Sequence, residues 1–244
     1  MLGAIVVAVN AATAFAGSSV PFVVSYVLLR LLLIALYLQA YAAVPEARAL
    51  TARYAGGFGL FVLIVLGEAV LVATTGMAGT SWQPVSVAIG ITGCGVALCL
   101  WWLYFDHLDV SVIDEALAGG TVDRARSHIW GYGHLFVSAA ILAISVGIEL
   151  AIEEASHATL TQGAGAAMAG GVAVYLVALS AVQWATPQSL PRTVLYARAA
   201  GAVGAAALAT LAPVLPPLAG AVLVTAILAA VTASESLRRR GAPR

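Results

Sequence analysis

The chain has 244 residues, of which 62% are hydrophobic and only 9% are charged. A soluble domain carries about 25% charged residues, so most of this chain must have lipid rather than water as its solvent. The formal net charge is zero, which gives no reason to expect a nucleic-acid partner, and the absence of lysine excludes Schiff-base chemistry with retinal or pyridoxal phosphate.

Hydropathy predicts eight apolar segments along the chain. The first begins at Met1 with no basic region before it, which is compatible with a cleaved signal peptide or with a helix that has lost its upstream sequence. We therefore predict an all-α, polytopic helical bundle in the membrane, forming a single domain over residues 1–244. The predicted spans are about 1–16, 20–41, 58–76, 84–105, 132–152, 163–185, 194–211 and 214–233.

The arginines predict the orientation of these spans. Ten of the eleven fall at alternate loops or in the C-terminal tail, on one side of the predicted bundle. The positive-inside rule assigns that side to the cytoplasm, so we expect both termini to be cytoplasmic and the protein to lie in the inner (cytoplasmic) membrane. All five tryptophans fall near predicted span ends, as an aromatic belt requires. The ten arginines are Arg48, Arg53, Arg124, Arg126, Arg192, Arg198, Arg238, Arg239, Arg240 and Arg244.

Two charged residues interrupt the predicted spans near their centres. Arg30 lies in the second segment and Glu68 in the third, within an apolar run from Phe58 to Thr75. An ionised acid at mid-helix costs about 2.5–3.5 kcal/mol on insertion scales, so such a residue usually faces the protein interior and has a partner. At a rise of 1.5 Å per residue, both lie roughly 15–17 Å from the predicted cytoplasmic side. We predict that they form a pair, directly or through one water.

Polar residues also recur at helical spacing on two of the segments. Tyr26, Arg30, Tyr37 and Tyr41 follow one face of the second segment, and His134, Ser138, Ser145 and Glu149 follow one face of the fifth. These faces favour a path for a small solute or an ion, since histidine and carboxylate chains are used in proton-coupled transport. The residues of this predicted path are Glu68 as titrating carboxylate, Arg30 as its counter-charge, and His134, Glu149 and Asp106 as access groups.

The same residues have a second interpretation. A buried Arg–Glu pair can fix helix register without conducting anything, and groups near the interfaces can reach water with their polar ends. In that case the protein is a non-transporting structural or stress-adaptation protein. A membrane-embedded enzyme with Glu68 or His134 as base is a third interpretation, but no obvious nucleophile and no soluble-enzyme motif accompanies them.

We predict no cofactor and no metal site. The sets His107, Asp109 and His128, and Glu149, Glu153 and His157, contain metal-ligating side chains, but the spacing of the first matches no closed metal motif. The expected partners are the lipid bilayer and an unknown small solute or ion, with no nucleic acid. A second copy of the chain, in a homo-oligomer, is a further partner to consider. Small-residue runs at 163–171 and 198–207 favour close helix packing or reflect an alanine-rich genome.

Three stretches occur in an order that resembles the bacterial low temperature requirement A (LtrA) family. They are Gly59–Glu68, then Leu100–Asp106, then Tyr132–Leu135 followed by Gly147–Glu149. They are similar to the family's "GLF-x-I-I-x-LGE" helix, its "WW-x-Y-F" helix, and its helix with an early histidine and a late glutamate. Tyr26–Arg30 resembles a further family helix, so the resemblance covers about residues 20–152. It implies a polytopic inner-membrane protein associated with growth at low temperature, without implying a biochemical activity.

The chain departs from that family pattern at two places. Members usually begin with a helix of the type "E-L-F-F-D-L-V-F", which is missing, and carry a Glu-Arg pair where this chain has Gly56-Gly57-Phe58. The resemblance therefore implies a shortened or divergent member.

Overall fold

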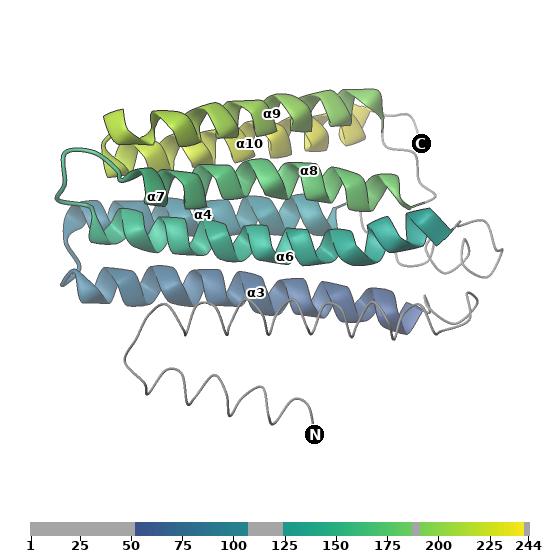
Figure 1. The fold of residues 1–244 in the computed structure, drawn as a ribbon, viewed down its shortest axis with the longest axis horizontal. Coiled ribbons are helices and arrows are strands. Elements are labelled where there is room, and N and C mark those ends of the chain that lie inside the picture. Colours follow the sequence, from purple (N-terminus) through teal and green to yellow (C-terminus); the bar gives the residue numbers. More distant parts are fainter. Residues whose placement is uncertain (1–51, 107–123, 187–190, 242–244) are drawn as a thin grey trace, which may run out of the picture. The chain divides into compact units, whose positions relative to one another are not determined.

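The computed structural model describes residues 52–106, 124–186 and 191–241, which all belong to one compact unit of the chain. Within these ranges the regular structure is helical, without strands (Figure 1). The long helices run antiparallel to their sequence neighbours and pack as a bundle. The elements are α3 (Ala52–Gly79), α4 (Pro84–Phe105), α6 (Arg124–Glu153), α7 (Gln162–Gly165), η1 (Ala166–Gly170), α8 (Gly171–Trp184), α9 (Arg192–Leu211), η2 (Ala212–Val214) and α10 (Pro217–Gly241).

Six stretches of these helices are long and apolar enough to cross a membrane. They correspond to the third through eighth predicted segments, so a multi-pass helical membrane protein is confirmed. The first two predicted segments, 1–16 and 20–41, lie outside the described residues and remain predictions. The six stretches are Gly57–Gly79, Pro84–Phe105, Ile129–Glu153, Gln162–Trp184, Arg192–Val214 and Pro217–Leu237.

The turn between α3 and α4 follows from local backbone chemistry. Trp82 N–H donates to the Met77 carbonyl and Ser81 N–H to the Ala78 carbonyl, which is the Schellman arrangement that ends many helices. Ser81 and Trp82 adopt positive φ angles of 54° and 58° in this turn. Pro84 then starts α4, where its fixed φ and missing N–H suit the first helical turn.

Glycine lets α6 approach the chain from α7 to α8 backbone to backbone. A Cβ on Gly147 would lie 2.2 Å from Met168 N, and one on Gly171 would lie 3.1 Å from Ile144 N. Met168 belongs to η1, a π-helical turn that joins α7 to α8 without breaking the span. Hydropathy predicted this span as one segment, 163–185, and gave no sign of the π-helical turn.

One end of the bundle gathers the described arginines, and we call it the arginine end. It holds the starts of α3, α6 and α9 and the ends of α4, α8 and α10 (Figure 1). Arg53, Arg124, Arg126, Arg192 and Arg238–Arg240 all occupy helix positions at this end. Their one-sided placement is confirmed, whereas the cytoplasmic assignment of that side remains a prediction.

Two residues of the sequence prediction lie in a different environment from the one expected. Arg198 was grouped with the loop arginines, but it lies inside α9 and its side chain is only 1% exposed. Trp130 was assigned to the aromatic belt, but it is 3% exposed and packs in the core. Both were misplaced because hydropathy reports depth along a helix and not which face of the helix is covered.

Candidate functional site

A buried polar cluster surrounds His134 near the arginine end. The imidazole of His134 lies on α6, with Trp130 one turn earlier and Ser138 one turn later on the same helix face. Tyr104 on α4 meets it edge to face, with ring centroids 5.8 Å apart, and Phe58 on α3 stacks on it at 4.5 Å. We call Tyr104, Trp130, His134 and Ser138 the His134 cluster.

The hydrogen bonds of His134 fix its tautomer. Nδ1 lies 2.7 Å from the backbone oxygen of Trp130. A carbonyl oxygen can only accept, so Nδ1 carries the hydrogen and donates it. In the neutral ring, Nε2 is then a lone-pair acceptor, and although it is buried it has no hydrogen-bond partner among the residues that the structure describes. The arrangement therefore presents a basic nitrogen inside the membrane part of the bundle.

All four members of the His134 cluster have a buried polar atom without a hydrogen-bond partner in the described part of the chain. These atoms are Tyr104 Oη, Trp130 Nε1, His134 Nε2 and Ser138 Oγ. Buried polar groups are normally hydrogen-bonded, because an unpaired one costs about 1–3 kcal/mol. Other hydroxyls in the described helices do find partners. Ser145 Oγ donates to Ile141 O at 2.8 Å, and Tyr175 Oη donates to Leu100 O at 2.6 Å.

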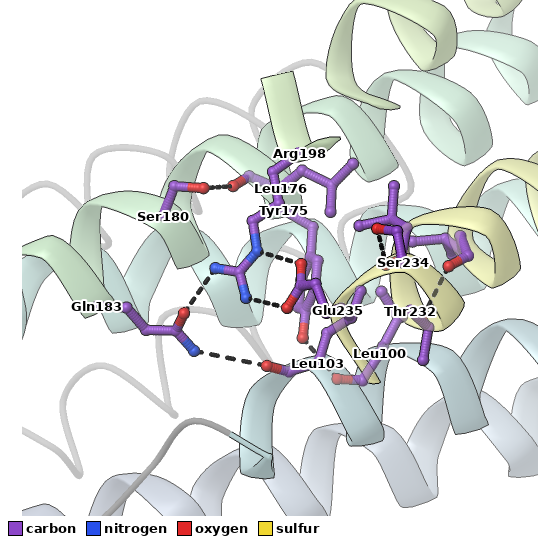
Figure 2. Close-up of polar contacts among 12 residues, drawn as sticks. Leu100, Leu103, Tyr175, Leu176, Ser180, Gln183, Arg198, Thr232, Ser234 and Glu235 are labelled. Atoms are coloured by element: carbon purple, nitrogen blue, oxygen red, sulfur yellow. Dashed lines mark hydrogen bonds and ion pairs between the residues drawn. The ribbon is translucent and has the colours of Figure 1, made fainter. Parts of the chain in front are cut away.

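A second buried group, the Arg198 network, is fully hydrogen-bonded by comparison. Arg198 on α9 donates from Nε and Nη2 to the two carboxylate oxygens of Glu235 on α10, at 2.7 and 2.8 Å (Figure 2). Its Nη1 donates to Gln183 Oε1 on α8 at 2.6 Å. Gln183 Nε2 in turn donates to the Leu103 carbonyl of α4 at 3.5 Å. The bidentate pair and the amide thus tie four helices together.

The last turns of α4 connect the two groups. The carbonyls of Leu100 and Leu103 accept from Tyr175 and Gln183 on the side of the Arg198 network, while the side chain of Tyr104 faces His134. These residues belong to the Leu100–Asp106 motif noted in the sequence. A displacement of this end of α4 would therefore alter both groups together.

The predicted site residues are distributed over different parts of the structure. His134 is buried, whereas Glu68 is exposed and lies eleven residues from either end of the Gly57–Gly79 span. Asp106 lies just after α4, at the arginine end, and Glu149 is half-buried near the other end of α6. Fully buried Ile141 lies between Ser138 and Ser145 on the interior face of α6. Arg30 is outside the described residues, so the predicted Arg30–Glu68 pair is untested.

The sequence interpretation missed Glu235 entirely. It ended the last span at residue 233 and treated the following Ser-Glu-Ser and arginines as a tail, whereas α10 continues to Gly241. The pairing of Glu235 with Arg198 could have been predicted from their positions in the sequence. Arg198 lies six residues after the start of α9 and Glu235 six residues before the end of α10, so the two charges fall at equal depth on sequential antiparallel helices.

Metal-ligating side chains do not gather in the described part of the chain, where no group of three or more His, Cys, Asp or Glu could hold an ion. The set Glu149, Glu153 and His157 lies where α6 ends at Glu153. Neighbouring Glu154 instead accepts hydrogen bonds from the backbone and hydroxyl of Thr161. His107 and Asp109 lie outside the described residues, and nothing is described of the His128 side chain.

The fold and these groups define a multi-pass helical membrane protein with buried polar groups near one end of its bundle. Residues 57–233, well over half of the chain, match the family described as bacterial low temperature requirement A protein (LtrA). The chain therefore belongs to the LtrA family, as the three sequence motifs predicted. No curated protein and no solved structure matches it.

Proposed function

We propose that this LtrA-family protein moves protons, or a small ion coupled to protons, across the cytoplasmic membrane. The observation that carries this proposal is the His134 cluster, in which three buried polar atoms and the open acceptor nitrogen of the imidazole lack hydrogen-bond partners among the described residues. A buried imidazole of this kind can accept a proton and release it again. Two of the three family-like motifs also meet here, because Tyr104 lies in the second and His134 in the third, and Phe58, which stacks on His134, directly precedes the first.

Glu68 is the second element of the proposed mechanism. Its carboxylate lies at the centre of a membrane-crossing stretch and on an exposed face of α3, a position where a charge without a partner is costly. Pairing with Arg30, at the same predicted depth, would keep it charged until a proton or a cation competes for it. In this role Glu68 is the midplane binding group and Arg30 its counter-charge.

The remaining predicted residues give access to these two groups. Asp106 follows the end of α4 at the arginine end, two residues after Tyr104, and in this mechanism it is the entry group on that side. Glu149 lies toward the opposite end of α6 and is the corresponding group on the other side. His134 would pass protons through the hydroxyls of Tyr104 and Ser138, both of which can donate as well as accept.

The test measures proton flux in proteoliposomes that contain the full chain and a pH-sensitive dye. A membrane potential is imposed, and the initial rate of internal pH change is recorded. We expect Glu68→Gln and His134→Gln each to reduce the rate at least tenfold, because neither amide can take up a proton. We expect Ser138→Ala to reduce it less.

Matched controls separate proton handling from folding. Ser145→Ala and Tyr175→Phe remove hydroxyls of α6 and α8 that already have backbone partners, and both should leave the flux unchanged. Folding of each variant is checked by its elution as a single species in detergent. A wild-type flux no greater than that of empty liposomes, or normal flux in Glu68→Gln, would reject the proposal.

A second function is favoured by the Arg198 network. Because its ion pair is bidentate and fully buried, it fixes the register of α8, α9 and α10 without needing to conduct anything. A protein built around such a pair fits a non-transporting role in membrane adaptation to low temperature. The absence of flux in the proteoliposome assay, with an intact fold, would favour this role.

A further inference from the structure

An apolar groove of about 710 Å³ runs along the outside of the bundle between α6, α8 and α9. Glycine and alanine form half of its lining, and larger exposed side chains stand beside them. Every lining residue lies within one of the three membrane-crossing stretches of these helices. The lining consists of Ile129, Tyr132, Gly133, Phe136, Ala173, Val174, Val177, Ala178, Ala181, Ala202, Val203 and Ala206.

The lining of the groove is suited to binding a hydrocarbon chain. Phe136, Val177 and Val203 are 56%, 62% and 70% exposed, so each of the three helices presents open apolar surface at the groove. A groove at this depth contacts lipid tails and not bulk water. A concave surface of this volume can take up an acyl chain, which binds by van der Waals contact with the small-residue floor.

A cation and an indole ring stand just beyond the arginine end of the groove. Arg126 lies three residues before Ile129 on α6, and Trp184 lies three residues after Ala181 on α8. The guanidinium carbon of Arg126 is 5.2 Å from the centre of the Trp184 ring, so the two side chains bridge α6 and α8 at this end. Trp184 is 52% exposed, as a tryptophan at the headgroup level would be.

We propose that this groove binds an anionic phospholipid, with one acyl chain between α6, α8 and α9 and the phosphate beside Arg126. The positive charge at one end and the uninterrupted apolar lining match the two parts of such a lipid. A second copy of the chain would use the apolar lining but would gain nothing from the cation. The proposal is independent of proton transport, because it concerns the outer face of the bundle and not the His134 cluster.

Native mass spectrometry of the delipidated full chain tests this, with phosphatidylglycerol and phosphatidylcholine of the same acyl chains as probes. One arginine near an anionic headgroup contributes about 1 kcal/mol, so we expect phosphatidylglycerol to bind about fivefold more tightly than phosphatidylcholine. Arg126→Gln should reduce phosphatidylglycerol binding to the level of phosphatidylcholine. Arg192→Gln, an exposed arginine at the start of α9 outside the lining, should retain the preference.

The groove itself is tested with a bulky residue on α9. Ala206→Phe places a ring in the groove and should weaken binding of both lipids, whereas Ala207→Phe, at an exposed neighbouring position outside the lining, should weaken neither. Equal affinity for the two lipids in the wild type would overturn the proposal. So would a dimer that Ala206→Phe converts to monomer without any change in lipid binding, because the groove would then be an interface between copies.

Discussion

Arg198 and Glu235 carry opposite charges in a place where a single charge would be costly. Their side chains are 1% and 2% exposed, and both lie within membrane-crossing stretches of the bundle. The attraction between the two charges offsets their desolvation only while the bidentate geometry and the Gln183 bond are kept. The pair therefore contributes more to the specificity of helix packing than to net stability.

An asymmetry between single and double variants follows from this pairing of buried charges. Arg198→Met or Glu235→Leu alone leaves one buried charge without its partner and should cost about 3–5 kcal/mol of unfolding free energy. The double variant replaces the pair by apolar side chains of similar size and should recover at least half of that loss. Denaturant unfolding in detergent micelles, followed by circular dichroism, measures all three. Additive losses in the double variant would contradict the asymmetry.

Residue-level prediction from the sequence succeeded where hydropathy alone was informative. The central position of Glu68 in its span and the interior position of the His134 stripe on α6 were both predictable from spacing. The lack of partners for Tyr104 Oη and His134 Nε2 within the described helices was not predictable, because it depends on which faces of α3, α4 and α6 meet. Hydropathy does not show which faces of two helices contact each other.

At the scale of elements, α6 packs closely against η1 and α8 because two of the contact positions are glycines. Gly147 faces the backbone of Met168, and Gly171 faces the backbone of Ala140 and Ile144. The sequence predicted close packing from the small-residue run at 163–171, but it did not identify the partner helix. Glycine contacts of this kind let helices approach where lipid gives little hydrophobic driving force for association.

Gly147→Ala should therefore separate α6 from η1, because the added Cβ meets backbone atoms that cannot rotate away. We expect a loss of about 1–3 kcal/mol of unfolding free energy, as for other overpacked sites. Gly131→Ala on the same helix is the matched control, since nothing lies within 4 Å of its added Cβ, and it should be neutral or slightly stabilising. Equal thermal midpoints for the two variants in detergent would contradict this account of the contact.

The whole molecule combines a one-sided charge distribution with polar groups displaced toward the same end. The arginine end holds the described helix-terminal arginines, and both the His134 cluster and the Arg198 network lie within a few turns of it. The positive-inside rule predicts that this end is cytoplasmic. If so, His134 and the proposed lipid headgroup site both lie on the cytoplasmic side, where anionic lipid attracts juxtamembrane arginine.

The orientation is tested by labelling single cysteines in the full chain, after Cys94 and Cys99 are replaced by alanine. Ser156 and Thr193 are exposed and lie at opposite ends of the bundle, Thr193 at the arginine end. In intact spheroplasts, a membrane-impermeant maleimide should label Ser156→Cys within minutes and should label Thr193→Cys only after the membrane is opened. The reverse pattern would place the arginine end outside. The positive-inside assignment would then fail, and Asp106 would be an outer access group instead of a cytoplasmic one.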